Sequence, residues 1–302
     1  MPENRPNDEA PRLRIALCHL ESLVCLPGLN VLFGEMGEQI GLVILSRRFG
    51  ARYGGLFTQL RRGIRRSGWR MTVWLGFDIV SAQIMSAVAS ATAPILGRES
   101  PLQSVRALAS RHGAKVVEVG DVNDAETIAT MAAYAPNLVI VFNFDQILKP
   151  GVIATAATAV INVHPSNLPS FRGPCPVFWA LAKGCREVGV SIHAITDGEI
   201  DAGPVLRQER TSIDPAQSVA EITSALFLAG ARLVPGVVRE LLEGRLRPSQ
   251  RIPSPNDDQC DYYSFPDPGD VASAIGRGIR LCHARPILRL MAAAIGRRVR
   301  LT

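Results

Sequence analysis

Residues 161–173 read INVHPSNLPSFRG, and residues 189–206 read GVSIHAITDGEIDAGPVL. The apolar run that leads into the first stretch is typical of a buried strand, and the prolines that follow it stiffen the next loop. Asn162 and His164 are two positions apart, so on a strand their side chains point to the same side. Asp201 lies in a glycine-bearing loop that can lie alongside them. This pattern predicts a polar site where a buried strand ends.

An amide, an imidazole and a carboxylate together suit the transfer of an acyl group to an amine. The amide N–H and an imidazolium can stabilise a developing oxyanion, and the carboxylate can orient the imidazole or help to remove the proton of the amine. A single histidine after a strand is more often structural, and an Asp-x-Gly turn is usually only a turn. The spacing alone therefore leaves both interpretations open.

Strands and helices alternate on both sides of this stretch. We expect strands at 13–17, 40–45, 114–119, 137–142, 159–163, 189–195 and 205–213, the last of them antiparallel. We expect helices at 104–112, 124–134, 176–183 and 219–242, and a helix or long loop at 20–36. This alternation predicts an α/β fold, with a mostly parallel sheet and helices on both faces. Such sheets place ligands beyond the carboxyl ends of their strands.

The two stretches resemble the folate-dependent formyltransferase family. Its members include glycinamide ribonucleotide formyltransferase, methionyl-tRNA formyltransferase, sugar-nucleotide N-formyltransferases and formyltetrahydrofolate deformylase. The family pattern is N-[IV]-H-x-S-x-L-P-x-[FWY]-[RK]-G, then G-V-[ST]-[IV]-H, then D-x-G, and it is matched here at 162–166, 168–173, 189–193 and 201–204. Residues 143–150, NFDQILKP, are similar to the family segment that lines the pterin pocket. The resemblance covers about 114–208, and many positions that match in order are a specific signal.

The resemblance implies a Rossmann-like sheet, 10-formyltetrahydrofolate as co-substrate, and no metal. It implies that Asn162 bonds the formyl oxygen as it becomes an oxyanion, and that His164 stabilises this charge or protonates the leaving N10. Asp201 would hold His164 in place and relay the proton of the amine. We interpret His193 as a strand histidine that packs under the site. The implied pterin-binding residues are Phe144, Gln146, Ile147, Leu148, Thr196, Asp197 and Gly198.

The acceptor is suggested mainly by elimination. Residues 18–22, CHLES, match neither the phosphate-binding loop of the glycinamide ribonucleotide enzyme nor the corresponding loop of the tRNA enzyme. Residues 53–91 form an atypical insert without a counterpart in the family. We therefore expect a small-molecule amine, first of all a nucleotide-linked amino sugar, since arginine suits phosphate. Amino-acid, peptide and lipid-linked amines remain open.

Two other functions compete with formyl transfer to an amine. A formyltetrahydrofolate hydrolase would use water in place of the amine. The deformylase relatives carry a regulatory domain ahead of the catalytic one, whereas only the leader at 1–12 is expected before the first strand here. We therefore expect transfer. A binding protein of the same fold could have lost the chemistry. The presence of Asn162, His164 and Asp201 speaks against that, because an inactive relative is free to lose them.

The composition is that of a globular protein, with 302 residues, 47% of them hydrophobic and 20% charged. We divide the chain into a flexible leader at 1–12, a catalytic domain at 13–246 that contains the 53–91 insert, and a C-terminal extension at 247–302. The six cysteines form no C-x-x-C pair, so neither a zinc site nor a disulfide framework is indicated. Reduced thiols predict a cytoplasmic protein.

The net charge is +6, and arginines at 61–66 and 297–300 carry much of it. A solvated surface is the usual explanation of such clusters. The basic and apolar residues of 277–300 are also compatible with a helix in peripheral contact with a membrane, although packing on the core or in a homodimer interface is commoner. Without about eighteen uninterrupted apolar residues, no spanning helix is expected. Aromatics are 6% and no recognition motif is present, so no nucleic-acid partner is expected.

Overall fold

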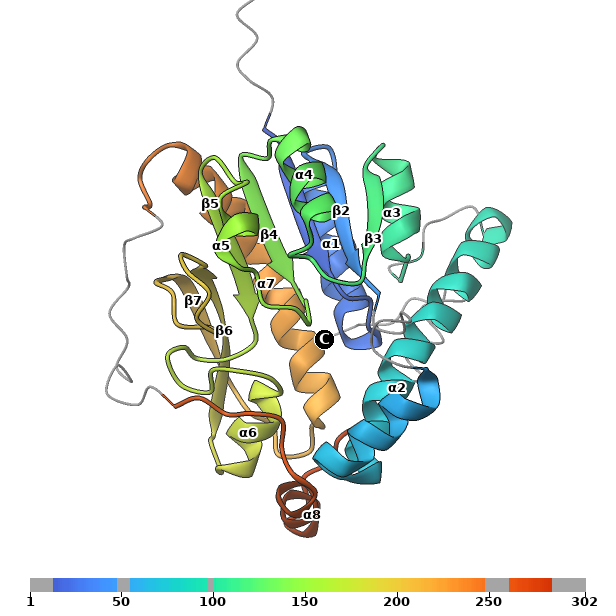
Figure 1. Cartoon of the computed structure of the whole chain (residues 1–302). Coiled ribbons are helices and arrows are strands. Elements are labelled where there is room, and N and C mark those ends of the chain that lie inside the picture. Colours follow the sequence, from blue (N-terminus) through green and yellow to red (C-terminus); the bar gives the residue numbers. More distant parts are fainter. Residues whose placement is uncertain (1–12, 48–54, 97–99, 101, 248–260, 284–302) are drawn as a thin grey trace, which may run out of the picture.

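A seven-stranded sheet forms the centre of the molecule in the computed structural model, which describes residues 13–47, 55–96, 100, 102–247 and 261–283. The strand order is β3-β2-β1-β4-β5-β6-β7 (Figure 1). Neighbours from β3 to β5 are parallel, and β6 and β7 are each antiparallel to the preceding strand. The predicted mostly parallel sheet is therefore confirmed, and the strand predicted at 205–213 pairs antiparallel with its neighbour β6, although β6 is the strand that runs opposite to the others. The strands are β1 (Ile15–His19), β2 (Ile40–Ser46), β3 (Lys115–Val119), β4 (Leu138–Phe142), β5 (Ala159–His164), β6 (Glu187–Ala194) and β7 (Val205–Ser212).

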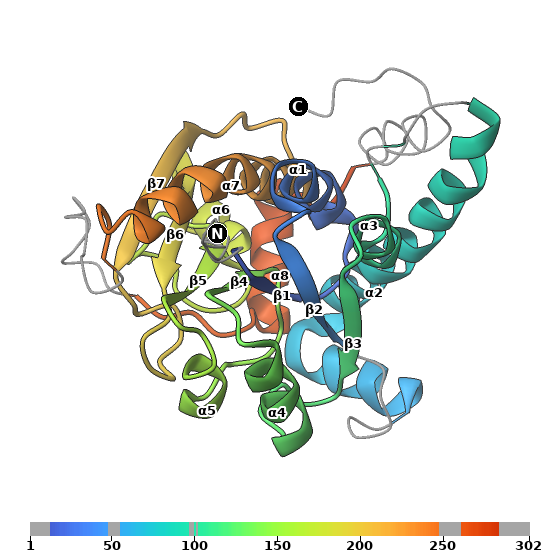
Figure 2. The ribbon, with the colours of Figure 1, turned by 90° about the horizontal axis from the view of Figure 1, so that it is seen from above.

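Helices cover both faces of the sheet, as predicted. Figure 2 shows α1 (Leu26–Met36) and α7 (Val219–Leu242) on one face, with α4 (Ala125–Tyr134) and α5 (Pro150–Ile153) on the other. The 3-10 helix η1 (Leu23–Cys25) precedes α1, so the segment for which a helix or loop was expected is helical. The remaining elements are α2 (Leu56–Leu96), α3 (Val105–Arg111), α6 (Pro176–Ala182) and α8 (Pro268–Gly276).

Each strand of the parallel part contributes to two apolar layers. Along β1, Ile15 and Leu17 belong to the core under α1 and α7, whereas Ala16 and Cys18 belong to the core under α4 and α5. All four side chains are fully buried. A strand buried on both faces reads as a continuous apolar run, and this is why the parallel strands could be located from sequence.

The atypical insert is helical. Helix α2 runs for 41 residues and is interrupted at Gly68, whose φ of 76° and ψ of 167° are not helical. It packs against η1 and α8, and the Asp78 carboxylate accepts a hydrogen bond from the Val24 N–H at 3.1 Å. The insert is thus attached to the loop after β1, at the carboxyl edge of the sheet.

Residues 261–283 return to the catalytic domain. Tyr262 bridges to Arg172, and the Trp179 indole N–H donates to the Ser264 carbonyl at 2.9 Å. Helix α8, with a capping box between Asp267 and Asp270, lies in the predicted C-terminal extension, at residues for which no helix was expected. The capping box is the local signal that identifies it.

Two predictions concern residues that the structure does not describe. The leader at 1–12 and most of the 277–300 segment lie outside the described residues. The division of the chain into leader, catalytic domain and extension stays a prediction.

Candidate active site

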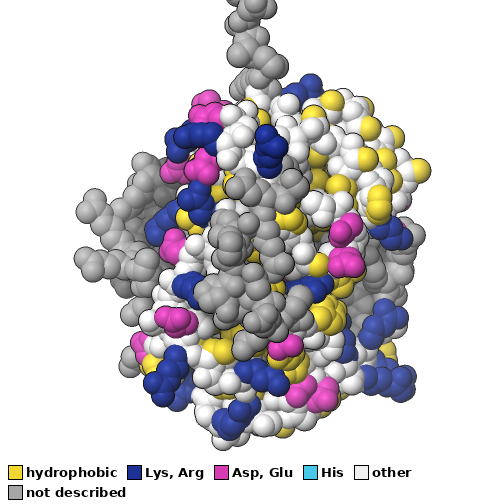
Figure 3. Space-filling view, turned by 90° about the vertical axis from the view of Figure 1, so that its left-hand side faces the viewer, with side chains coloured by type: hydrophobic (Ala, Val, Ile, Leu, Met, Phe, Trp, Pro, Cys, Tyr) yellow, Lys and Arg dark blue, Asp and Glu magenta, His cyan; other side chains and the backbone are white. Residues whose placement is uncertain are grey.

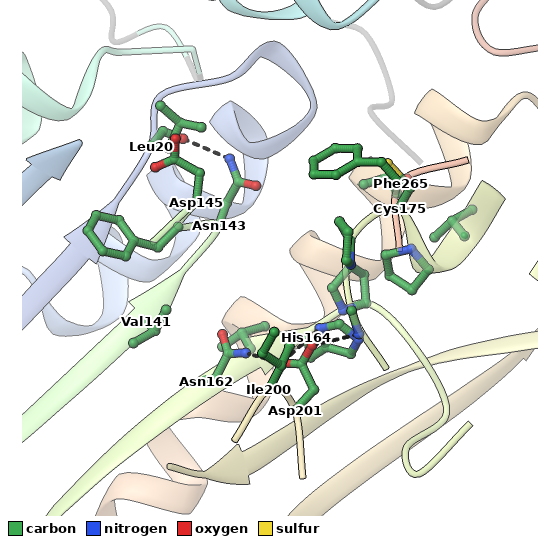
Figure 4. A pocket seen from close by; sticks show the side chains of 18 of the residues that line it. Leu20, Val141, Asn143, Asp145, Asn162, His164, Cys175, Ile200, Asp201 and Phe265 are labelled. Atoms are coloured by element: carbon green, nitrogen blue, oxygen red, sulfur yellow. Dashed lines mark hydrogen bonds and ion pairs between the residues drawn. The ribbon is translucent and has the colours of Figure 1, made fainter. Parts of the chain in front are cut away.

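Strand β5 and the loop after β6 bring the three predicted catalytic residues together (Figure 4). The Asn162 side-chain nitrogen lies 3.2 Å from the Asp201 carboxylate. The His164 Nδ1 lies 3.6 Å from the same carboxylate oxygen. Strand β6 is antiparallel to β5 and ends at Ala194 beside Ile161, and the loop that follows brings Asp201 to the side chains of Asn162 and His164. The sequence-based prediction that these side chains meet is consistent with this geometry.

Arg172 and Gly173, which follow Pro169, hold Asp201 and its loop in place. The Gly173 N–H donates to Asp201 Oδ2 at 2.9 Å, and the Arg172 guanidinium donates to the Ile200 carbonyl through Nε at 2.9 Å and Nη2 at 2.7 Å. Gly173 has a φ of 94°, and a Cβ at this position would collide with the Tyr263 carbonyl oxygen. Only glycine fits this position and presents its N–H to Asp201.

Asp201 is ionised at neutral pH. Burial by itself would raise the pKa of Asp201, but the His164 charge, contacts with His193 and the Gly173 N–H together lower this pKa below its ordinary value. Hydrogen bonds that a carboxylate accepts stabilise its charged form. The site therefore contains a fixed negative charge that faces two imidazoles.

The surroundings of His164 favour its neutral form. Burial lowers the pKa of His164, and the nearby Asp201 carboxylate opposes this shift without cancelling it. Its Nε2 lies 3.3 Å from the Phe171 carbonyl oxygen, which can only accept, so we assign the proton of the neutral ring to Nε2. The Nδ1 that faces Asp201 is then the atom that gains a proton when a charge develops nearby.

His193 is more closely involved than the sequence suggested. Its Nδ1 lies 3.1 Å from the Ala194 carbonyl oxygen, which assigns the proton to Nδ1 and leaves Nε2 as an acceptor. Nε2 lies 3.0 Å from the Asn162 amide nitrogen and 3.5 Å from Asp201. The position of His193 on β6 fits its interpretation as a buried strand histidine under the site, and its contacts with Asn162 and Asp201 are additional to that. Only the β5–β6 register, which pairs Asn162 with His193, could have indicated this contact.

The amide of Asn162 is oriented by these two neighbours. In the structure its nitrogen faces both Asp201 and His193, so both of its hydrogens have partners. An incoming oxyanion would compete with them for one of these hydrogens. Asn162 can serve as an oxyanion donor after a small rotation of its side chain, and His193 helps to set its position.

A cavity of about 520 Å³ adjoins this group of side chains. Asn162, His164 and Asp201 form part of its wall. Such a volume is within the range of small-molecule and cofactor sites. The structure thus places the predicted catalytic side chains next to a space large enough for substrates.

Most of the predicted pterin-binding residues line the same cavity. They are Phe144, Gln146, Ile147, Leu148, Asp197 and Gly198. Thr196 does not line it: its side chain is exposed and its hydroxyl lies 3.4 Å from Asp197, while the preceding residue, Ile195, faces the cavity instead. The Gln146 side chain bonds Ser46 and the Val122 N–H, so it holds its loop in place, which fits recognition of a ligand through the main chain.

The other end of the cavity is built from segments that sequence analysis did not assign to the site. Met71, Trp74, Leu75, Asp78 and Ile79 of α2 line it, together with Tyr262, Ser264 and Phe265. Among the described lining residues the charged ones are all acidic, and they are Asp78, Asp145, Asp197, Glu199 and Asp201. No local motif marks the α2 residues, because they reach the site only through the packing of the insert on η1.

An amide, an imidazole and a carboxylate at the carboxyl edge of a mostly parallel sheet define a class of acyl-transfer proteins with a Rossmann-like fold. The model of the Formyl transferase family matches residues 81–238, just over half of the chain, and this match includes all three side chains. The chain belongs to the formyl transferase family.

Curated relatives agree with this assignment. A methionyl-tRNA formyltransferase of Synechococcus sp. (strain JA-3-3Ab) is 35% identical over 158 residues, which are 52% of this chain and 47% of that protein. A methionyl-tRNA formyltransferase of Rhodopirellula baltica is 36% identical over 154 residues, 51% and 46% of the two chains. The chain spans about half the length of these curated relatives.

Solved structures share the fold at low sequence identity. The phosphoribosylglycinamide formyltransferase of Anaplasma phagocytophilum superposes with a TM-score of 0.52 at 19% identity, covering 84% of this chain and 98% of that one. A sugar 3N-formyl transferase, crystallised with dTDP and 5-N-formyl-THF, gives 0.51 at 15% identity, covering 84% and 70%. These likenesses establish the Rossmann-like fold.

Proposed function

We propose that this protein transfers a formyl group from 10-formyltetrahydrofolate to a primary amine. The observation that carries the proposal is the convergence of Asn162 and His164, at 3.2 and 3.6 Å, on the Asp201 carboxylate in the wall of a cavity. Membership of the formyl transferase family supports a folate donor.

The roles follow from the protonation states. The amine nitrogen first adds to the formyl carbon and gives a tetrahedral intermediate with an oxyanion. The proton that the amine loses passes to the neutral His164, and the Asn162 amide and the resulting imidazolium would stabilise the oxyanion. Asp201 stabilises the imidazolium, which gives its proton to N10 as the bond from the formyl carbon to N10 breaks and the carbonyl re-forms.

The described lining of the cavity favours an acceptor without a phosphate. The first candidate from sequence, a nucleotide-linked amino sugar, depended on arginines that bind phosphate. The charged side chains of the described lining are all carboxylates, which repel a phosphate and attract an ammonium group. We therefore propose a small amine of low negative charge, such as a free amino sugar, an amino-acid derivative or an amine-bearing lipid.

Methionyl-tRNA is a second candidate acceptor. It is favoured by the identity of 35% to an enzyme named for that substrate. The sequence predicted no nucleic-acid partner, and the chain covers only half of that relative. Methionyl-tRNA is therefore one of the acceptors in the assay below.

The proposal is tested by incubating the full chain with 10-formyltetrahydrofolate and a panel of amino sugars, nucleotide-linked amino sugars, amino acids, amine-bearing lipids and methionyl-tRNA. Mass spectrometry should detect one added formyl group on one class of amine. His164→Ala should lower the rate at least about 100-fold and leave Tm nearly unchanged. The control is His112→Ala, which removes a histidine that packs on Phe33 away from the cavity and should keep its activity.

Two outcomes would contradict the proposal. Folate turnover at full rate without any amine would identify a hydrolase. Full activity of His164→Ala would show that the three side chains are not the catalytic group.

A further inference from the structure

Helix α2 exposes a continuous apolar surface. From Trp69 to Ile84 the exposed large apolar side chains are spaced by four, four, three and four residues, which places them on one side of the helix. Each has an exposed fraction of at least 39%. We call this set the outer stripe of α2, and its members are Trp69, Val73, Phe77, Val80 and Ile84.

The outer stripe is not an unfilled part of the core, because the opposite side of α2 is already buried. Met71, Ala82, Met85 and Ala89 are buried there, and Asp78 contacts the Val24 N–H. The outer stripe therefore faces away from the cavity and from the body of the molecule, and Figures 1 and 2 show α2 along the outside of the fold. Monomeric soluble proteins rarely expose so long an apolar surface without a partner.

The exposed charges of α2 itself have a single sign. In its basic half, before and just after Gly68, the side chains of Arg61, Arg62, Arg65 and Arg70 are exposed. Between Leu56 and Leu96 the one carboxylate is Asp78, which is buried. Phe57, Leu60 and Ile64 are exposed in the same half. The nearest acidic side chains of a neighbouring element are Asp267 and Asp270 at the start of α8, beside Gly68. The exposed surface of α2 therefore suits a partner that is both apolar and anionic.

The opposite side of the molecule is different. Figure 3 shows the side that carries β7, where Lys and Arg side chains lie among Asp and Glu. Arg207 of β7, for example, pairs with Glu240 at 2.7 Å. The combination of apolar stripe and unbalanced positive charge is thus a property of α2 and not of the whole surface.

We propose that α2 docks on the surface of an anionic phospholipid bilayer. The outer stripe would enter the boundary between headgroups and acyl chains, and the arginines would contact lipid phosphates, as in interfacial amphipathic helices. A second copy of this chain would cover the stripe but would offer the arginines no carboxylate from its own α2. A bilayer satisfies both requirements.

Docking along the surface fits better than crossing. By length and composition, α2 is the one helix of the described residues that is apolar enough to cross a membrane, although the sequence predicted none. Within its most apolar window 39% is buried in the fold, and Ser81 and Ser86 are among the buried residues. Crossing would require α2 to leave η1 and α8, whereas lying on the surface preserves these contacts.

The test is sedimentation of the full chain with vesicles at low salt. We expect binding to vesicles that contain phosphatidylglycerol and little binding to pure phosphatidylcholine. The double variant Val73→Glu/Val80→Glu should weaken binding at least about tenfold, and so should Arg61→Glu/Arg65→Glu. Matched controls reverse one charge on β7, Arg210→Glu, or place a glutamate at an exposed apolar position of α7, Leu242→Glu, and both should bind like the wild type.

Three outcomes would overturn the docking proposal. These are no binding to anionic vesicles, equal binding by the outer-stripe variants, or a lipid-independent dimer that Val73→Glu/Val80→Glu dissociates. All four variants should keep the wild-type Tm and formyl transfer to a soluble amine, since the altered residues do not line the cavity. Docking and formyl transfer can therefore fail separately.

Discussion

His19, at the end of β1, is fully buried, although no step of the proposed reaction uses it. Its Nδ1–H donates to the Phe142 carbonyl at 2.6 Å, while Nε2 has no hydrogen-bond partner among the described residues. Burial lowers the pKa of His19 from 6.5 to about 4, against the opposing effect of the Phe142 hydrogen bond. The folded protein therefore keeps this ring neutral under conditions in which the unfolded chain would protonate it.

The free energy of unfolding should fall as the pH is lowered from about 6.5 to about 4. In this range the unfolded chain binds a proton at His19, whereas the folded chain does not. The full effect is on the order of 3 kcal/mol for this group. His19→Gln keeps a donor for Phe142 and cannot titrate in this range. Urea denaturation at several pH values should give a flatter dependence for His19→Gln than for the wild type, and equal slopes would show that His19 is not the group responsible.

Helix α2 depends on one glycine at its kink. The φ and ψ of Gly68 lie in a region that is essentially restricted to glycine. A Cβ built there would lie 3.4 Å from Pro268. The kink therefore sets the direction of the basic half of α2 relative to the half that lines the cavity, and it lies against α8.

Gly68→Ala should lower the free energy of unfolding by about 1–3 kcal/mol, since alanine adopts this backbone conformation only with strain. The matched control is Gly76→Ala in the same helix, where a Cβ would meet open space and should add up to about 1 kcal/mol of stability. Chemical denaturation of both variants measures the difference. A gain in stability for Gly68→Ala would mean that α2 is straight in solution.

At the scale of the whole molecule, the C-terminal segment supports the active site from a distance along the chain. The Tyr263 ring lies 5.5 Å from the Phe171 ring and 5.0 Å from the Trp179 ring. Its N–H donates to the Arg172 carbonyl at 2.9 Å. Because the Gly173 N–H donates to Asp201, the packing of Tyr263 is connected to the position of the Asp201 carboxylate.

Tyr263→Ala should therefore reduce formyl transfer about tenfold, as expected when a catalytic group is misplaced, and reduce stability by about 2 kcal/mol. Tyr263→Phe keeps the stacked ring and should retain most of both properties. Leu242→Ala, at the exposed end of α7, should leave the rate unchanged. Comparing kcat with the denaturation midpoint separates the two effects, and an unchanged kcat in Tyr263→Ala would remove the proposed connection.

Much of the fold and part of the site could be predicted because their signals are local. The parallel strands read as apolar runs, and α7 begins at a Ser218–Glu221 capping box. Asn162 and His164 share a side because strand periodicity is two. Thr196, which was predicted to bind the pterin, does not line the cavity, since the direction of a side chain in an irregular loop is not periodic.

By itself, the sequence determined the α/β class, the antiparallel final strand and the residue types of the site, since periodicity and motif spacing act between neighbours in the chain. The tertiary structure alone decided that His193 meets Asn162, that α2 walls the cavity and exposes the outer stripe, and that Tyr263 supports the Asp201 loop. These contacts join segments far apart in the chain. Their geometry depends on strand register and helix packing, which no local pattern encodes.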